Sequence, residues 1–277
     1  MKKIAILPTL LTLGNAICGF AAIAYASKIN PGQPGTERFF AISGWLIFAA
    51  MVFDALDGYV ARLSRVASKF GAELDSLCDA ISFGLAPAYL LMRMGPGWEP
   101  LPSLHQALAG IAALYMVCAI LRLARYNVET AADPASSKRF RGLPSPGAAG
   151  CIAALGLVRG TLPQLAHDFR WLDMSIAQQA LQIWATVGAL VVALLMVSRV
   201  PYPHLTKQML RGRRHFSHLI QVLVLAYVIF VVPVVALVVI FWLYGLGIPL
   251  RHALARSLRP RRFPRTEGPS VTDTVPH

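Results

Sequence analysis

Four aspartates lie close together in the segment DALDGYVARLSRVASKFGAELDSLCD, between two strongly apolar stretches of the chain. Asp54 and Asp57 are spaced i, i+3, and Asp75 and Asp79 are spaced i, i+4. In a helix, either spacing places both side chains on one face. The intervening RLSRVASKFG is polar and basic and suits a solvent-exposed turn. Two antiparallel helices joined by this turn would bring the four carboxylates together.

Such a cluster needs cations, because four neighbouring carboxylates cannot all stay ionised without them. Oxygen ligands without sulfur or histidine are those that Mg²⁺ and Mn²⁺ prefer, and two such ions can clamp a phosphoryl group. Small residues beside the aspartates, Gly58, Ala61 and Gly71, would let a ligand or another helix approach the backbone. A metal site, an ion-conducting path and structural pairing between helices all remain open at this point.

The elements that must position the aspartates are membrane spans. The chain of 277 residues is 56% hydrophobic and 14% charged, whereas soluble domains carry about 25% charged residues. A helix of about 20 apolar residues crosses a bilayer, and continuous apolar runs favour helices over the alternating strands of a barrel. We therefore expect an all-α, polytopic membrane helical bundle. Its six core spans are expected at 5–27, 39–61, 72–94, 105–125, 146–162 and 179–198.

The C-terminal part is expected to add two further spans within the apolar stretch 216–250, turning near Pro233, and the alternative is one long span there, for seven in all. This keeps the basic tail RHALARSLRPRRFPR on the same side as the other basic connections. The predicted organisation is a membrane core over 1–207, a transmembrane hairpin over 208–250 and a disordered basic tail over 251–277 that contacts anionic lipid.

Basic residues concentrate in alternate connections, which is the positive-inside pattern. This distribution explains the net charge of +13 and argues against nucleic-acid binding. It places the N-terminus and the turn between the aspartate pairs in the cytoplasm. We expect a multi-pass protein of the cell membrane, the inner membrane in a bacterium, with its site facing the cytoplasm.

The aspartate segment reads D-x-x-D-G-x-x-A-R-x8-G-x-x-x-D-x-x-x-D and resembles the signature of the CDP-alcohol phosphotransferase family at every fixed position. Flanking pieces, among them LPTLLTLGNAICGFAAI, LARYNV and FRGLPSPGAAG, resemble the serine-using branch of this family, the phosphatidylserine synthases. One departure is Thr9, where the family usually has asparagine after Pro8.

This resemblance implies transfer of a phosphatidyl group from CDP-diacylglycerol to L-serine, with release of CMP, two Mg²⁺ or Mn²⁺ ions, a retained first helix and a homodimer. It implies that Asp79 is the catalytic base and also contacts a metal. The implied metal ligands are Asp54, Asp57, Asp75 and Asp79. The implied contacts to CDP-diacylglycerol are Thr12, Asn15, Gly58, Ala61, Arg62, Ser68 and Gly71.

Serine needs a partner for its carboxylate, and a guanidinium binds one best through two parallel hydrogen bonds. Arg122 and Arg125, at the cytoplasmic end of the fourth span, are the candidates, although both also suit membrane anchors. Two other functions remain: the same chemistry with glycerol 3-phosphate or inositol phosphate as acceptor, and a cation transporter that uses the aspartates as its path. A phosphorylated acceptor would require additional cations near the site.

Overall fold

The structure is a computed structural model that describes residues 6–30, 33, 35–64, 69–95, 102–132, 140–168, 173–202 and 231–257. Almost all of these residues are helical, and six of the described helical segments are long and apolar enough to cross a membrane. The expected polytopic helical bundle is therefore confirmed. Large apolar side chains on the outside of α1 (Ile6–Ser27), such as Ile17 and Phe20, are more than half exposed, as suits a surface that faces lipid.

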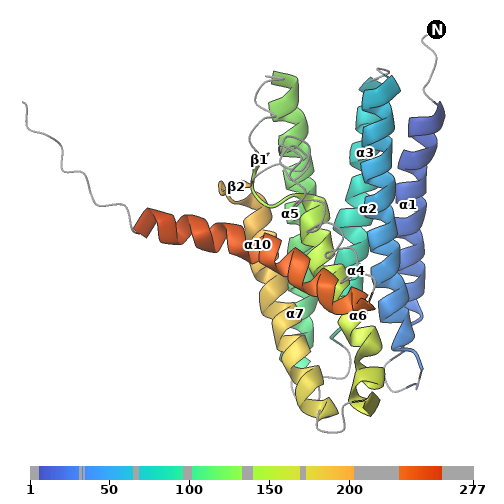
Figure 1. Ribbon diagram of the computed structural model, residues 1–277, viewed down its shortest axis with the longest axis vertical. Helices are drawn as coiled ribbons and strands as arrows, with labels where there is room; N and C mark the ends of the chain where they lie inside the picture. The colour runs from blue at the N-terminus through green and yellow to red at the C-terminus, as the bar shows by residue number, and fades with distance from the viewer. Residues whose placement is uncertain are drawn as a thin grey trace, which may run out of the picture.

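The remaining helices follow in chain order and are shown in Figure 1. They are α2 (Arg38–Ser64), α3 (Lys69–Asp79), the π-helical turn η1 (Ala80–Leu85), α4 (Ala86–Arg93), α5 (Pro102–Ala132), α6 (Ser145–Asp168), α7 (Met174–Val197) and α10 (Pro233–Ser257). The span expected at 72–94 thus consists of α3, η1 and α4 in direct succession.

Helix α6 contains the span expected at 146–162. It packs against α2, α7 and α10, and its residues from Ala148 to Leu157 are buried. A helix enclosed by protein can be built from glycine and alanine and need not be as apolar as a helix that faces lipid.

Helix α10 differs from expectation. It begins at Pro233, where the turn between two spans was expected, and continues to Ser257, so its C-terminal part lies in the range expected to be disordered. The first arm of the expected hairpin lies outside the described residues. Figure 1 shows α10 running across the bundle instead of alongside the other helices.

A short antiparallel pairing fastens the connection between α5 and α6 to the end of α7. Strand β1 (Phe140–Arg141) pairs with β2 (Pro201–Tyr202), and the Gly142 amide donates to the Val200 carbonyl at 2.9 Å. Gly142 has a φ of 88°, and a Cβ atom there would collide with the Met196 carbonyl oxygen. Glycine is therefore required at this position.

Candidate functional site

The C-terminal half of α2 and helix α3 bring three of the four aspartates together. Carboxylate oxygens of Asp54, Asp57 and Asp75 all lie within 4.8 Å of one another. Asp57 is buried, and the other two are partly buried. The expectation that two helices joined by a basic turn would gather these carboxylates is confirmed for this trio.

The donor set of the trio fits a hard divalent cation. Oxygen Oδ2 of Asp57 and oxygen Oδ1 of Asp75 are buried and accept no hydrogen bond from the described residues. Buried acceptors without a donor cost free energy, and a cation bound between them would remove that cost. Arg62 interacts electrostatically with Asp54 and Asp57, but its side chain is exposed. The trio could therefore hold a metal ion of the Mg²⁺ or Mn²⁺ type.

Asp79 lies outside the trio but interacts electrostatically with its members, and it is held by the first helix. The side-chain amide of Asn15 donates to Asp79 Oδ1 at 3.0 Å, and Asn15 is fully buried. The Ser82 hydroxyl donates to the Asn15 backbone carbonyl at 2.9 Å. One turn further along α1, a Cβ atom on Gly19 would collide with Ser82. Close contact between α1 and the turn after Asp79 thus fixes the position of this carboxylate.

The turn that follows Asp79 is the π-helical segment η1, a type of distortion found frequently at functional sites. In a regular helix the Phe83 carbonyl would accept from the N–H of residue 87, but Pro87 has no N–H. The Tyr115 hydroxyl of α5 donates to this carbonyl at 3.0 Å instead, and Tyr115 is fully buried. Neither Ser82 nor Tyr115 was predicted; the proline four residues after Phe83 is the sequence signal for the second.

Several residues expected to contact the nucleotide surround the trio. Thr12 is buried on α1 and lies beside the Asp57 carboxylate. On α2, Arg62 folds back over Gly58, since its Nη1 atom lies 3.4 Å from the place of a Cβ atom on Gly58. Ala61 on α2 and Gly71 on α3 are partly exposed. Ser68 lies outside the described residues.

The two arginines expected at the acceptor have different surroundings. Arg122 donates from Nη1 to the Ser145 hydroxyl at the start of α6 and interacts electrostatically with Asp79. Arg125 instead pairs with Glu129 on its own helix, with 2.7 Å between Nε and Oε1, and its side chain is 36% exposed. Arg122 is therefore bonded to α6 and lies within electrostatic reach of Asp79, whereas Arg125 is paired within its own helix.

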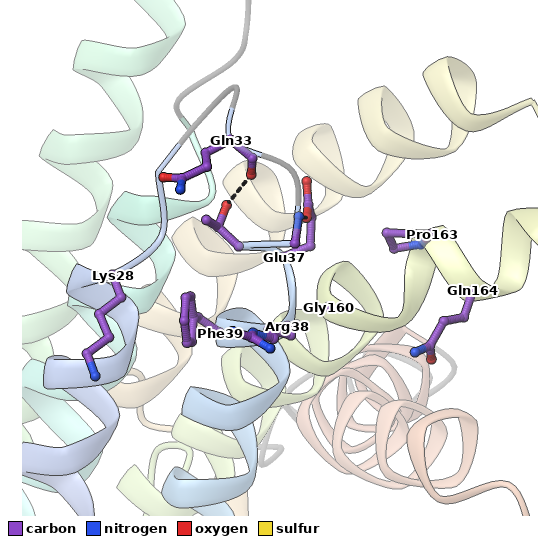
Figure 2. Close-up of a pocket in the computed structure, with 10 residues that line it drawn as sticks. Lys28, Gln33, Glu37, Arg38, Phe39, Gly160, Pro163 and Gln164 are labelled. Carbon is purple, nitrogen blue, oxygen red and sulfur yellow. Dashed lines mark hydrogen bonds between the residues drawn. The ribbon is translucent and has the colours of Figure 1, made fainter.

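A separate cavity of about 720 Å³ lies beside the connection between α1 and α2, against the C-terminal part of α6 (Figure 2). Its polar lining includes Lys28, Glu37, Arg38 and Gln164. Asp54 lies about 24 Å further along α2 than Arg38, at about 1.5 Å of rise per residue. This cavity is therefore at the opposite end of the bundle from the aspartates.

Comparison with known proteins agrees with this arrangement. The family described as CDP-alcohol phosphatidyltransferase matches residues 5–252. A protein of Helicobacter pylori is 32% identical over 245 residues, covering 88% of this chain and 90% of its own length. A protein of Methanocaldococcus jannaschii is 32% identical over 204 residues, covering 73% and 76%. One of Bacillus subtilis is 29% identical over 201 residues, covering 73% and 92%. All three are named CDP-diacylglycerol–serine O-phosphatidyltransferase.

Proposed function

Because the chain belongs to the CDP-alcohol phosphatidyltransferase family, we propose that it transfers a phosphatidyl group from CDP-diacylglycerol to the hydroxyl of L-serine. The products are phosphatidylserine and CMP. The observation that carries serine as the acceptor is the position of Arg122, whose guanidinium interacts with Asp79 and binds the Ser145 hydroxyl. Serine needs a base for its hydroxyl and a cation for its carboxylate, and these two residues supply both. The names of the relatives support the same acceptor.

The trio and Asp79 are assigned as the metal ligands. Asp54, Asp57 and Asp75, with Asp79 in some states, would hold two Mg²⁺ or Mn²⁺ ions, which would neutralise the diphosphate and stabilise the charge on departing CMP. Around them, Thr12 and Asn15 of α1, Gly58, Ala61 and Arg62 of α2, Ser68, and Gly71 of α3 are assigned to the CDP portion. Arg62 is exposed and can move onto a phosphate.

Asp79 is assigned the role of general base. It accepts the proton of the serine hydroxyl while the serine oxygen attacks the lipid-side phosphorus; the bond from this phosphorus to the oxygen of the CMP phosphate breaks, and CMP leaves. The amide of Asn15 occupies one oxygen of Asp79, so the other oxygen is left for the proton. Asn15 thereby orients the base in addition to any contact with the nucleotide.

Arg122 is assigned to bind the carboxylate of serine. Its planar guanidinium can form two parallel hydrogen bonds to a carboxylate while its position at Ser145 is kept by α6. Arg125 is already paired with Glu129 on the same face of α5 and is assigned to the membrane surface. A phosphorylated acceptor would need further cations at this place.

The site is proposed to face the cytoplasm, where serine and the CDP-linked lipid head group meet, in the bacterial inner membrane or its equivalent. The positive-inside distribution of lysine and arginine supports this orientation. A homodimer is proposed on the resemblance to the family, and chemical cross-linking in the native membrane tests it.

The test of the proposed function is CMP release from CDP-diacylglycerol by the purified protein. We expect CMP and phosphatidylserine in equal amounts when Mg²⁺ or Mn²⁺ and serine are present. If the protein prefers glycerol 3-phosphate or inositol phosphate to serine, the proposed acceptor is wrong but the proposed reaction class is still correct. Metal flux in proteoliposomes without CMP release would instead support a transporter.

A further inference from the structure

Helix α10 lies beyond the expected six-helix core, yet it is closely fitted to the core. A Cβ atom on Gly150 would collide with the Phe241 ring, and one on Gly188 would collide with the Trp242 ring. A Cβ atom on Gly147 would lie 3.0 Å from the Tyr244 ring. Aromatic rings from consecutive parts of α10 thus pack against three glycines, two on α6 and one on α7. Such contacts set the position of α10 on the core.

A hydrogen bond joins α10 to β2, the strand that follows α7. The Tyr202 hydroxyl donates to the Gly245 carbonyl at 2.9 Å. That carbonyl lacks its usual helical donor because the residue four positions on is Pro249, which has no N–H. Tyr202 also pairs with Phe140 in the short sheet. The segment that leads into Ser145 is therefore bonded to the end of α7 and to β2, and β2 in turn is bonded to α10.

Tyr244 is placed on the side of α10 that faces the acceptor arginine. Its ring rests on Gly147, two residues after Ser145, and lies 5.7 Å from the Tyr202 ring. The Tyr244 hydroxyl and the Arg122 guanidinium interact electrostatically. Tyr244 is only partly buried.

We propose that α10 forms one wall of the acceptor pocket and that Tyr244 determines acceptor specificity. Its hydroxyl donates a hydrogen bond to the acceptor carboxylate held by Arg122, and its ring limits the size of the acceptor that fits between Arg122 and Asp79. This inference rests on the proposed function, and it extends the site to a helix that the signature around the aspartates does not contain. The chemical class it selects is a short hydroxy amino acid.

The first test is Tyr244→Phe, which removes the hydroxyl and keeps the ring on Gly147. We expect the KM for serine to rise about tenfold or more, as for a lost hydrogen bond to a charged group, while the KM for CDP-diacylglycerol stays within twofold of wild type. Leu243→Ala is the matched control, since Leu243 is the neighbouring residue, is 66% exposed and faces away from the core. It should leave both constants unchanged.

The second test is Tyr244→Ala, which opens the pocket. The ratio of kcat/KM for homoserine to that for serine should increase, a change that a merely structural role would not produce.

If both variants leave the serine KM and the acceptor ratio within twofold of wild type, the inference is overturned while the proposed function stands. Equal losses for serine and CDP-diacylglycerol would also overturn it, because α10 would then only support the fold. If the wild-type protein does not use serine at all, the proposed function fails first and the inference fails with it.

Discussion

Asn15 and Asp79 are 64 positions apart in the chain, yet the Asn15 side-chain amide donates to Asp79 Oδ1 at 3.0 Å inside the bundle. The amide is fixed in turn, because Ser82 bonds the Asn15 backbone and Gly19 lets α1 approach the helix that follows Asp79. The carboxylate proposed as the base is therefore oriented by a helix other than its own.

Replacement of Asn15 separates orientation of the base from binding of the nucleotide. In Asn15→Ala, Asp79 loses its donor and should rotate, so we expect kcat to fall at least about tenfold, as when a charged hydrogen bond is lost. The KM for CDP-diacylglycerol, to which Asn15 is also assigned, should rise by a smaller factor. Cys18→Ala, a partly buried position on the same helix, is the control. A large rise in this KM at unchanged kcat would assign Asn15 to the nucleotide instead.

Removal of divalent cations should abolish activity. The buried oxygens of Asp57 and Asp75 without donors make the trio unable to bind a diphosphate unless cations are present. Activity should disappear with EDTA and return with Mg²⁺ or Mn²⁺, and calorimetry should detect Mn²⁺ binding to the protein itself. Full turnover after thorough chelation would contradict the proposed metal site.

Two asparagine substitutions distinguish base from ligand. Asp79→Asn removes basicity and keeps the shape, so turnover should fall by about 10²–10⁴-fold while CDP-diacylglycerol still binds with metal. Asp57→Asn should instead weaken Mn²⁺ binding and, with it, binding of CDP-diacylglycerol. These effects should not add in the double variant, since the carboxylates act as a unit. A fall of less than tenfold in Asp79→Asn would reject its role as the base.

Arg122 and Arg125 form a matched pair for testing the acceptor. Arg122→Lys keeps the charge and loses the planar fork, so the loss of a charged hydrogen bond, about 1.5–3 kcal/mol, should raise the serine KM roughly ten- to a hundredfold. Arg125→Lys should leave it within twofold, because Arg125 pairs with Glu129. Binding of CDP-diacylglycerol should be unchanged in both. An effect of Arg125→Lys as large as that of Arg122→Lys would contradict the assignment.

The orientation in the membrane is tested by labelling single cysteines from outside the cell. A probe at Gln33, in the exposed connection between α1 and α2, should react, and one at Lys69, the exposed first residue of α3, should not. Lysed cells are the control in which both react. Each probe is introduced into a variant in which the four native cysteines are replaced by alanine, namely Cys18, Cys78, Cys118 and Cys151. Labelling only at Lys69 would reverse the topology.

The carboxylate trio was predictable because it depends on short spacings. Asp54 and Asp57 share a helix face by their spacing alone, and a hairpin at the basic stretch after them would return Asp75 to the same level. The bounds of α1 followed from an apolar run of the right length. These signals are local, so a single sequence contains them.

The contacts of Asp79 and Arg122 could not be predicted in the same way. Asn15 reaches Asp79, and Arg122 reaches Ser145, across helix interfaces whose register depends on which small residues meet. The crossing of α10 depends on glycines of α6 and α7 that receive its aromatic rings, and nothing in the hydropathy of α10 distinguishes that arrangement from an ordinary span. Pro87 and Pro249 were visible local signals of freed carbonyls, but their tyrosine partners were not.

The enclosed position of α6 has a consequence for which substitutions the bundle tolerates. The residues of α6 from Ala148 to Leu157 are buried, and the helix packs against α2, α7 and α10, whereas Ile17 and Phe20 on α1 are more than half exposed. A side chain on the outer face of α1 can change in size without displacing a neighbouring helix. A larger side chain within the buried stretch of α6 must displace one, so substitutions there should be the more destabilising.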